Sequence, residues 1–374
     1  MALPIDDLLR ELVEKDASDL HLKAGSAPCM RIRGSLVRLD IPAIPIEEHN
    51  NRLFSILNEE RRHRLETIKE VDLSYNVPGL ARFRVNMFWQ RGNIGAVFRV
   101  IPFNIRTIDE LNLPKICKSI SLLPRGLVLV TGPTGSGKST SLAAMINHIN
   151  HSKRCHIMTI EDPIEYVHKD NISIINQREL STDTHSFAHA LKHVLRQNPD
   201  VILVGEMRDL ETIQLAITAA ETGHLVLSTL HTVDAAQTID RIVDVFEPDQ
   251  QAQVRTQLSV TLQAVISQTL IPHKKGAGRV AAFEVMTATA SIRNMIRDGK
   301  THQLPTDIQM GSQHGMQSLD GHLLRLVENG EIEYEDALAK SSNVFEFQHR
   351  AQQHGLIGGT PNAVHRRDSF KRCG

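Results

Sequence analysis

The segment with the clearest chemical signature in this chain is GPTGSGKST, which runs from Gly132 to Thr140. It satisfies the pattern G-x-x-x-x-G-K-[ST], in which glycines let backbone N–H groups approach the phosphates of a nucleotide closely. A strand-like apolar run, GLVLVT, precedes it, and a helical apolar pattern follows it. We therefore expect ATP to be bound by nine consecutive residues: Gly132, Pro133, Thr134, Gly135, Ser136, Gly137, Lys138, Ser139 and Thr140.

Two side chains of this segment carry groups suited to a triphosphate with its metal. The Lys138 ammonium would neutralise charge on the β and γ phosphates, and the Ser139 hydroxyl would ligate Mg²⁺. The helix that follows would point the positive end of its dipole at the phosphates. The sequence thus predicts ATP and Mg²⁺ as cofactors.

Two later segments place carboxylates directly after apolar strands. TIEDPIEYVH carries Glu161 and Asp162 before a proline, and VILVGEMRD carries Glu206 after Gly205. Ligands of open α/β sheets bind at the carboxyl ends of the strands. We expect Glu206 to be the general base or to position the attacking water, with a water-mediated contact to Mg²⁺. Glu161 would act through the magnesium shell or on a second water.

The patterns around these residues indicate an α/β protein of two domains. Up to about residue 101, short alternating runs predict a small mixed sheet, with helices over 5–16 and 47–66. From Gly126 onwards, buried-type strands alternate with helices, which predicts a parallel sheet covered by helices on both faces. Residues 250–270 and 285–340 look mainly helical.

Composition favours a soluble cytosolic protein without direct affinity for nucleic acid. The chain has 374 residues, and its 42 Lys and Arg against 43 Asp and Glu give a net charge of −1. Such a balance offers no excess positive charge for a phosphate backbone. We expect neither a membrane span nor a signal peptide, since no apolar run approaches the roughly 18 residues needed. Four widely spaced cysteines are expected to be reduced thiols.

Taken together, these motifs resemble those of the secretion-ATPase superfamily, and within it most closely those of the type IV pilus retraction ATPases. The phosphate loop and both acidic segments carry the resemblance, together with the early SDLHL and the long run VILVGEMRDLETIQLAITAAETGHLVLSTLHT. The run FEVMTATASIRNMIRDGK also resembles the helical retraction segment of that family, with Ser291 where alanine is usual. The resemblance covers roughly residues 5–340.

The resemblance implies a division of the chain into named parts. It implies a PAS-like α+β domain over residues 1–101 and a RecA-like P-loop domain with C-terminal helices over 115–340. The sequence between them, residues 102–114, is read as a linker carrying a short helix. Residues 341–374 are expected to be a poorly ordered tail, because they combine mixed polarity with a basic end.

The resemblance also implies roles for further residues. Glu161 and Asp162 correspond to the family's Asp box, Glu206 to its Walker B motif, and His224 and His231 to its His box. Because His231 ends a strand and His224 begins it, we expect His231 on the phosphate side. Five arginines are candidates to stabilise the charge of the transition state, with Arg84 and Arg99 ranked first. The five are Arg82, Arg84, Arg99, Arg279 and Arg293.

The function that the resemblance implies is a homohexameric motor that hydrolyses ATP to depolymerise pilin, which supports twitching motility. It would work at the cytoplasmic face of the inner membrane, against a platform protein of the pilus and alongside other pilus ATPases. An accessory retraction ATPase and a conjugation-type ATPase remain alternatives. A pilus-extension or type II secretion ATPase is disfavoured, because the four-cysteine metal motif and longer N-terminal region typical of those proteins are lacking. A nucleotide-gated ring without turnover and a nucleic-acid translocase are alternatives from other classes.

Overall fold

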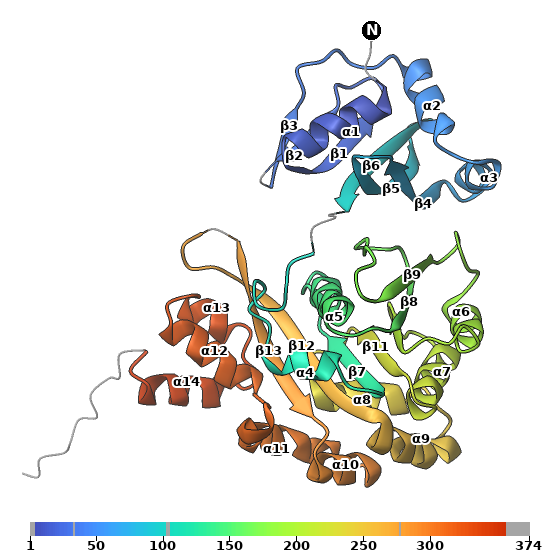
Figure 1. Cartoon of the computed structure of the whole chain (residues 1–374). Coiled ribbons are helices and arrows are strands. Elements are labelled where there is room, and N and C mark those ends of the chain that lie inside the picture. The colour runs from blue at the N-terminus through green and yellow to red at the C-terminus, as the bar shows by residue number, and fades with distance from the viewer. Residues whose placement is uncertain (1–3, 33, 102–104, 277, 357–374) are drawn as a thin grey trace, which may run out of the picture. The chain divides into compact units, whose positions relative to one another are not determined.

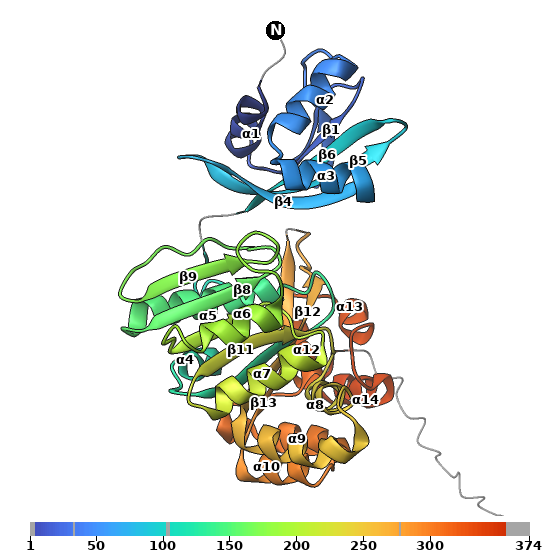
Figure 2. The same ribbon diagram turned by 90° about the vertical axis from the view of Figure 1, so that its right-hand side faces the viewer.

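The computed structural model describes residues 4–32, 34–101, 105–276 and 278–356 and contains two β-sheets (Figures 1 and 2). The chain divides into two compact units. The first comprises Met1–Leu111, Cys117–Leu127 and Ser139–Thr229, and the second comprises Asn112–Ile116, Val128–Lys138 and Leu230–Gly374. The domain boundaries expected from the sequence stay a prediction.

The N-terminal sheet has the strand order β3-β2-β1-β6-β5-β4. Its strands are β1 (Ala17–Lys23), β2 (Cys29–Ile32), β3 (Ser35–Arg38), β4 (Glu70–Val77), β5 (Ala81–Gln90) and β6 (Asn93–Ile101). All of its pairings are antiparallel, so the predicted mixed sheet is wrong. Tight turns explain the difference: Arg91 and Gly92 take φ of 48° and 75°, which suits the two-residue turn of an antiparallel hairpin.

Three helices accompany this sheet, namely α1 (Ile5–Glu14), α2 (Ile46–Ser55) and α3 (Glu59–Ile68) (Figure 1). The leucines of α1 at helical spacing are buried. On β5 every second residue is buried, including Phe83 and Val85, which is the pattern of a strand with one face on a core. The N-terminal part therefore has an α+β core of its own.

The second sheet has the strand order β13-β12-β7-β11-β10-β8-β9. Its strands are β7 (Gly126–Thr131), β8 (His156–Glu161), β9 (Ile174–Glu179), β10 (Val201–Val204), β11 (Leu225–Leu230), β12 (Leu262–Pro272) and β13 (Arg279–Thr287). β8 pairs in parallel with β9 and β10, and β10 pairs in parallel with β11. The predicted parallel sheet is confirmed for these strands.

The hairpin of β12 and β13 corrects the sequence prediction, because part of it falls in a segment expected to be helical. The helix α9 (Pro248–Thr261) ends where Leu262 becomes extended, and β12 then pairs antiparallel with β13. Most of β12 is buried. A strand buried on both faces has a nearly continuous apolar sequence, which periodicity alone does not separate from a buried helix.

The remaining helices alternate with these strands or follow the hairpin. They are α4 (Ile116–Ser121), α5 (Lys138–Ser152), α6 (Phe187–Val194), α7 (Leu210–Glu221), α8 (Ala235–Val243), α10 (Ala290–Arg297), α11 (Leu304–Met310), α12 (Leu319–Glu328), α13 (Tyr334–Leu338) and α14 (Val344–Gln353). In the part of the chain that the structure describes, no helix is both long and apolar enough to cross a lipid bilayer.

Two expectations about the connecting and terminal segments need revision. The segment after residue 104 forms a turn, closed by Leu111 N donating to Thr107 O at 3.1 Å, where a short helix was predicted. The expected poorly ordered tail is wrong for α14, because its Phe347 and Ala351 are fully buried in a core with α12 and α13. Residues 102–104 of the predicted linker and 357–374 of the predicted tail lie outside the described residues.

Candidate active site

The phosphate loop leaves β7 through a glycine that no other residue could replace without movement. Gly132 has φ of 142°, and a Cβ built there would lie 2.2 Å from the backbone oxygen of Gln268. L-residues rarely adopt that conformation, and a backbone oxygen has no flexible end that could move away. The local fold therefore requires glycine at this position for a reason separate from the phosphates.

Strand β12 braces the loop from the side. Gln268 Nε2 donates to the carbonyl of Ser136 at 2.6 Å, and Thr131 Oγ1 donates to Ser267 Oγ at 2.8 Å. All of these side chains are buried. The sequence analysis missed Ser267 and Gln268, and the signal that could have revealed them is the polar run from Ser267 to Thr269 inside a mostly apolar strand.

The loop itself presents donors suited to an anion. Lys138 Nζ donates to the carbonyls of Gly132 at 2.8 Å and Pro133 at 3.1 Å. The ammonium group is therefore held against the backbone of the loop. The buried hydroxyl of Ser136 has no hydrogen-bond partner among the described residues. A buried cation and an unsatisfied hydroxyl on a glycine-rich loop fit the oxygens of a phosphate chain.

The first turn of α5 carries the remaining predicted ligands. Ser139 is partly exposed. Thr140 Oγ1 and Tyr166 Oη share a hydrogen bond of 2.8 Å, which ties this helix to the segment between β8 and β9. The chemistry of Ser139 fits Mg²⁺, since a hydroxyl is one of the oxygen ligands that hard cations prefer.

Glu161 ends β8 and is held by three donors. Its Oε1 accepts from Thr159 Oγ1 at 2.6 Å and from Gln177 Nε2 at 3.1 Å, and its Oε2 accepts from Glu165 N at 3.4 Å. Burial raises the pKa of Glu161, because desolvation outweighs these hydrogen bonds. Asp162, the next residue, is exposed. Glu161 thus has the partly desolvated setting that is typical of an acid–base group.

Glu206 lies at the end of the neighbouring strand. β8 and β10 are in register, with Ile160 opposite Val204, and Gly205 N donates to Ile160 O at 2.8 Å. Both carboxylates therefore follow strand ends at the same edge, as the sequence predicted. Glu206 Oε2 pairs with Arg208 Nη2 at 2.7 Å, and this pairing raises the pKa of Arg208. The sequence analysis did not select Arg208, although it stands only two residues after Glu206.

The two histidines of the expected His box lie at opposite ends of β11. His231 Nδ1 is 3.5 Å from Lys138 Nζ, which is the side expected for a residue near the phosphates. His224 precedes the strand, and its Nδ1 lies 2.9 Å from the carbonyl oxygen of Ala219. The assignment of His231 to phosphate sensing remains a prediction that this geometry supports.

Three of the candidate arginines have partners within their own unit. Arg82 pairs with the buried carboxylate of Glu179 at 2.7 Å, and Arg99 pairs with the buried Asp19 at 2.8 Å. Arg293 Nη1 donates to the carbonyls of Ser259 and Val260 at 2.7 and 2.8 Å, which holds α10 against the end of α9. These contacts are structural, and a role for any of these three at the nucleotide remains a prediction.

The other two candidate arginines differ from these. The side chain of Arg84 has no hydrogen-bond or ion-pair partner in the described parts of the chain, and the residue lies opposite Arg99 in the pairing of β5 with β6. Arg279 is exposed at the start of β13. Of the two arginines ranked first, Arg84 is thus the one whose guanidinium is not committed to a carboxylate.

A buried carboxylate at the start of α8 was also missed by the sequence analysis. Glu284, on β13, is buried and accepts a hydrogen bond from the backbone N–H of Ala235 at 2.8 Å, at the start of α8. Burial, together with the neighbouring charges of Asp234 and Asp320, raises the pKa of Glu284 to about 7. The folded protein therefore favours the neutral form of this carboxyl group.

Glu284 should make the stability of the protein fall as the pH rises from about 4.5 to about 7. Its folded pKa exceeds the ordinary value of 4.5, so the stabilising proton is fully present below pH 4.5 and is lost as the pH passes 7. The difference corresponds to about 3 kcal/mol. Glu284→Gln should remove this fall, as measured by urea unfolding at pH 5 and pH 8. Glu335→Gln, at an exposed glutamate of the same unit, should retain it, and an unchanged slope in Glu284→Gln would contradict the argument.

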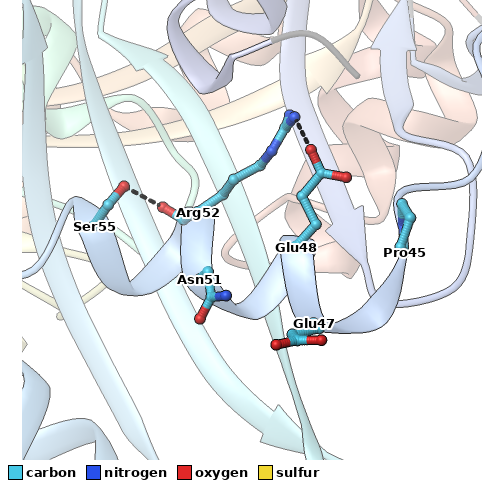
Figure 3. Close-up of a pocket in the computed structure, with 6 residues that line it drawn as sticks. All are labelled: Pro45, Glu47, Glu48, Asn51, Arg52 and Ser55. Carbon is cyan, nitrogen blue, oxygen red and sulfur yellow. Dashed lines mark hydrogen bonds and ion pairs between the residues drawn. The ribbon is translucent and has the colours of Figure 1, made fainter. Parts of the chain in front are cut away.

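A pocket in the N-terminal part involves none of the predicted site residues. It is lined by Pro45, Glu47, Glu48, Asn51, Arg52 and Ser55, all on or next to α2 (Figure 3). Arg52 Nη2 and Glu48 Oε1 point toward one another across one turn of the helix, 2.5 Å apart. A helix-surface ion pair of this kind is typical of a solvated face, and we assign no ligand to it.

Comparison with known proteins agrees with this fold and this loop. The family model described as type II/IV secretion system protein matches residues 96–338. The type IV pilus retraction ATPase PilT of Pseudomonas aeruginosa is 52% identical over 339 residues, covering 91% of this chain and 98% of the relative. The twitching motility protein of Neisseria gonorrhoeae is 49% identical over 92% of both chains.

Among solved structures, a crystal structure of the pilus retraction motor PilT with bound ADP superposes with a TM-score of 0.88. It is 47% identical and covers 93% of this chain and 100% of the other. The predicted fold class, an N-terminal α+β domain followed by a P-loop ATPase domain with a helical C-terminal region, is confirmed. The chain belongs to the type II/IV secretion system protein family, and we identify it as an ATPase of that family.

Proposed function

We propose that this protein is the ATPase that powers retraction of type IV pili and thereby twitching motility. The observation that carries the proposal is the braced phosphate loop, combined with close similarity over nearly the whole chain to a retraction motor solved with ADP. Two named relatives, a retraction ATPase and a twitching motility protein, support the same activity.

Different residues of the site bind the phosphates, hold the metal ion and activate the water. The glycine-lined amides and Lys138 bind the phosphates, and the Ser139 hydroxyl is the group that would hold Mg²⁺, which neutralises phosphate charge when bound. Glu206 positions the attacking water and accepts its proton, while Glu161 assists from the neighbouring strand end. The arrangement of both carboxylates after adjacent strands supports this division.

We further propose that the protein acts as a homohexameric ring on the cytoplasmic side of the inner membrane, where it works against the platform protein of the pilus. Retraction requires that hydrolysis in one subunit be converted into displacement of a neighbour, which a ring of identical ATPases provides. Similarity to ATPases of secretion and pilus systems supports this assembly.

Deletion of the gene tests the direction of the motor. Retraction predicts more surface pili and no twitching, and a copy encoding Glu206→Gln should fail to restore motility. Loss of surface pili would contradict retraction and support an extension ATPase. Normal pilus number with partly retained twitching would instead support an accessory retraction ATPase.

A further inference from the structure

We propose that Gln177, on β9, is a positioning residue that holds the carboxylate of Glu161 in place for hydrolysis of ATP. The inference rests on the proposed function, because it requires Glu161 to act on water at the nucleotide. Gln177 itself was not selected by the sequence analysis, since nothing in the run IINQRE distinguishes its polar side chain from an ordinary exposed one.

The side-chain amide of Gln177 is held by three partners. Its Nε2 donates to Glu161 Oε1 at 3.1 Å and to the carbonyl of Tyr166 at 2.8 Å, while its Oε1 accepts from His168 N at 2.8 Å. Only one orientation of the amide satisfies these groups, because the oxygen faces a donor and the nitrogen faces two acceptors. The orientation of the Gln177 amide is therefore fixed, and the amide in turn restrains the Glu161 carboxylate.

The register of the sheet explains why Gln177 reaches Glu161. Gln177 lies opposite Thr159 in the parallel pairing of β8 with β9, and Thr159 and Glu161 are on the same face of β8 because they alternate. Two donors, Thr159 Oγ1 and Gln177 Nε2, thus converge on the single oxygen Oε1.

The consequence for Glu161 is an asymmetry between its two oxygens. Oε1 is immobilised by two side-chain donors, whereas Oε2 receives, among the described residues, only a backbone contact of 3.4 Å from Glu165. A long contact of this kind is weak. Oε2 is therefore the oxygen of Glu161 that can accept a hydrogen bond from a water. The donors to Oε1 determine the direction in which Oε2 faces.

Gln177 also restrains the segment that follows Glu161. It holds this segment through Tyr166 and His168, and the hydroxyl of Tyr166 shares a hydrogen bond with Thr140 at the start of the phosphate-binding helix. A purely structural role would operate through these backbone contacts alone, so the test must separate them from the contact with Glu161.

Gln177→Glu and Thr159→Val together make that separation, because Thr159→Val removes a donor to Oε1 and leaves the contacts of Gln177 with Tyr166 and His168 in place. Gln177→Glu keeps the side-chain length and the acceptor for His168 N, but it loses both donors and places a second negative charge beside Glu161. We expect kcat for phosphate release to fall about 10–100-fold, since a hydrogen bond to a charged group is lost. The KM for ATP should change less than about 2-fold, because Gln177 contacts no phosphate-binding residue.

Two further variants make the result interpretable. Thr159→Val is isosteric, removes the other donor to Oε1, and should lower kcat in the same way even if Gln177→Glu folds poorly. Asn176→Ala is the matched control, because Asn176 is the preceding residue of β9, is exposed on the opposite face, and its side chain bonds His156 at 2.9 Å. It should leave both kcat and KM unchanged.

The outcomes distinguish the inference from the function on which it rests. Wild-type kcat in Gln177→Glu or in Thr159→Val, or equal loss in Asn176→Ala, would overturn the role of Gln177 while leaving the ATPase intact. A wild-type protein that releases no phosphate would overturn the proposed function, and the positioning role with it.

Discussion

Replacement of Glu206 by glutamine should leave ATP binding unchanged and reduce hydrolysis about 10²–10⁴-fold, the usual loss when a general base is removed. Glutamine has the same length and shape, so the end of β10 and the hydrogen bond to Arg208 should persist. The amide has no basic oxygen with which to accept a proton from water. Binding of a fluorescent ATP analogue and colorimetric detection of released phosphate measure the two properties separately.

A matched control is available five residues further along the chain. Glu211 lies in the first turn of α7 and is exposed, so Glu211→Gln removes an equal charge near the same segment and should hydrolyse ATP normally. Wild-type hydrolysis by Glu206→Gln would contradict the assignment of the base. Equal and negligible phosphate release from the wild type and from Glu206→Gln would support a nucleotide-gated ring without turnover.

Replacement of Gly132 by alanine should abolish nucleotide binding and lower the free energy of unfolding by about 3 kcal/mol or more. The new Cβ would lie 2.2 Å from the backbone oxygen of Gln268, and the φ of 142° is unfavourable for any L-residue. The loop must shift away from β12 to relieve the contact, which breaks the brace between Gln268 and Ser136. Thermal unfolding and ATP-analogue binding report the two effects.

Gly135 provides the comparison for this result. It also has positive φ, 78°, but nothing lies within 4 Å of a Cβ built there. Gly135→Ala should therefore cost only the conformational penalty, about 1–2 kcal/mol. If the two variants lose equal stability, the contact with the backbone of β12 is not what makes Gly132 necessary.

The parts of the site that sequence reasoning found are those whose chemistry is local. The phosphate loop is a contiguous run, and its glycines and lysine must stand at fixed spacing because one stretch of backbone wraps the ligand. Glu161 and Glu206 were found for a related reason: each directly follows an apolar strand, and strand ends of a parallel sheet share one edge. The functional assignments of these residues stay predictions until they are measured.

The parts that were missed depend on contacts between distant segments. Gln268 reaches the loop from 132 residues away in the chain, and Gln177 reaches Glu161 across a strand pair. A polar run inside an apolar strand can mark such a residue, but it does not identify the partner, since a polar residue in a strand has many possible partners. The strand β12 was itself misread as helix, so its bracing side chains could not be placed.

The position of Lys138 has a consequence for the energetics of nucleotide capture. A lysine side chain normally loses about 2 kcal/mol of rotational freedom when it is pinned to a ligand. Here the two carbonyls of Gly132 and Pro133 already confine the ammonium, so that loss occurs when the chain folds. When a nucleotide binds, a phosphate oxygen replaces these carbonyls as the acceptor for the Lys138 ammonium. Nucleotide binding therefore causes little further loss of side-chain entropy at Lys138.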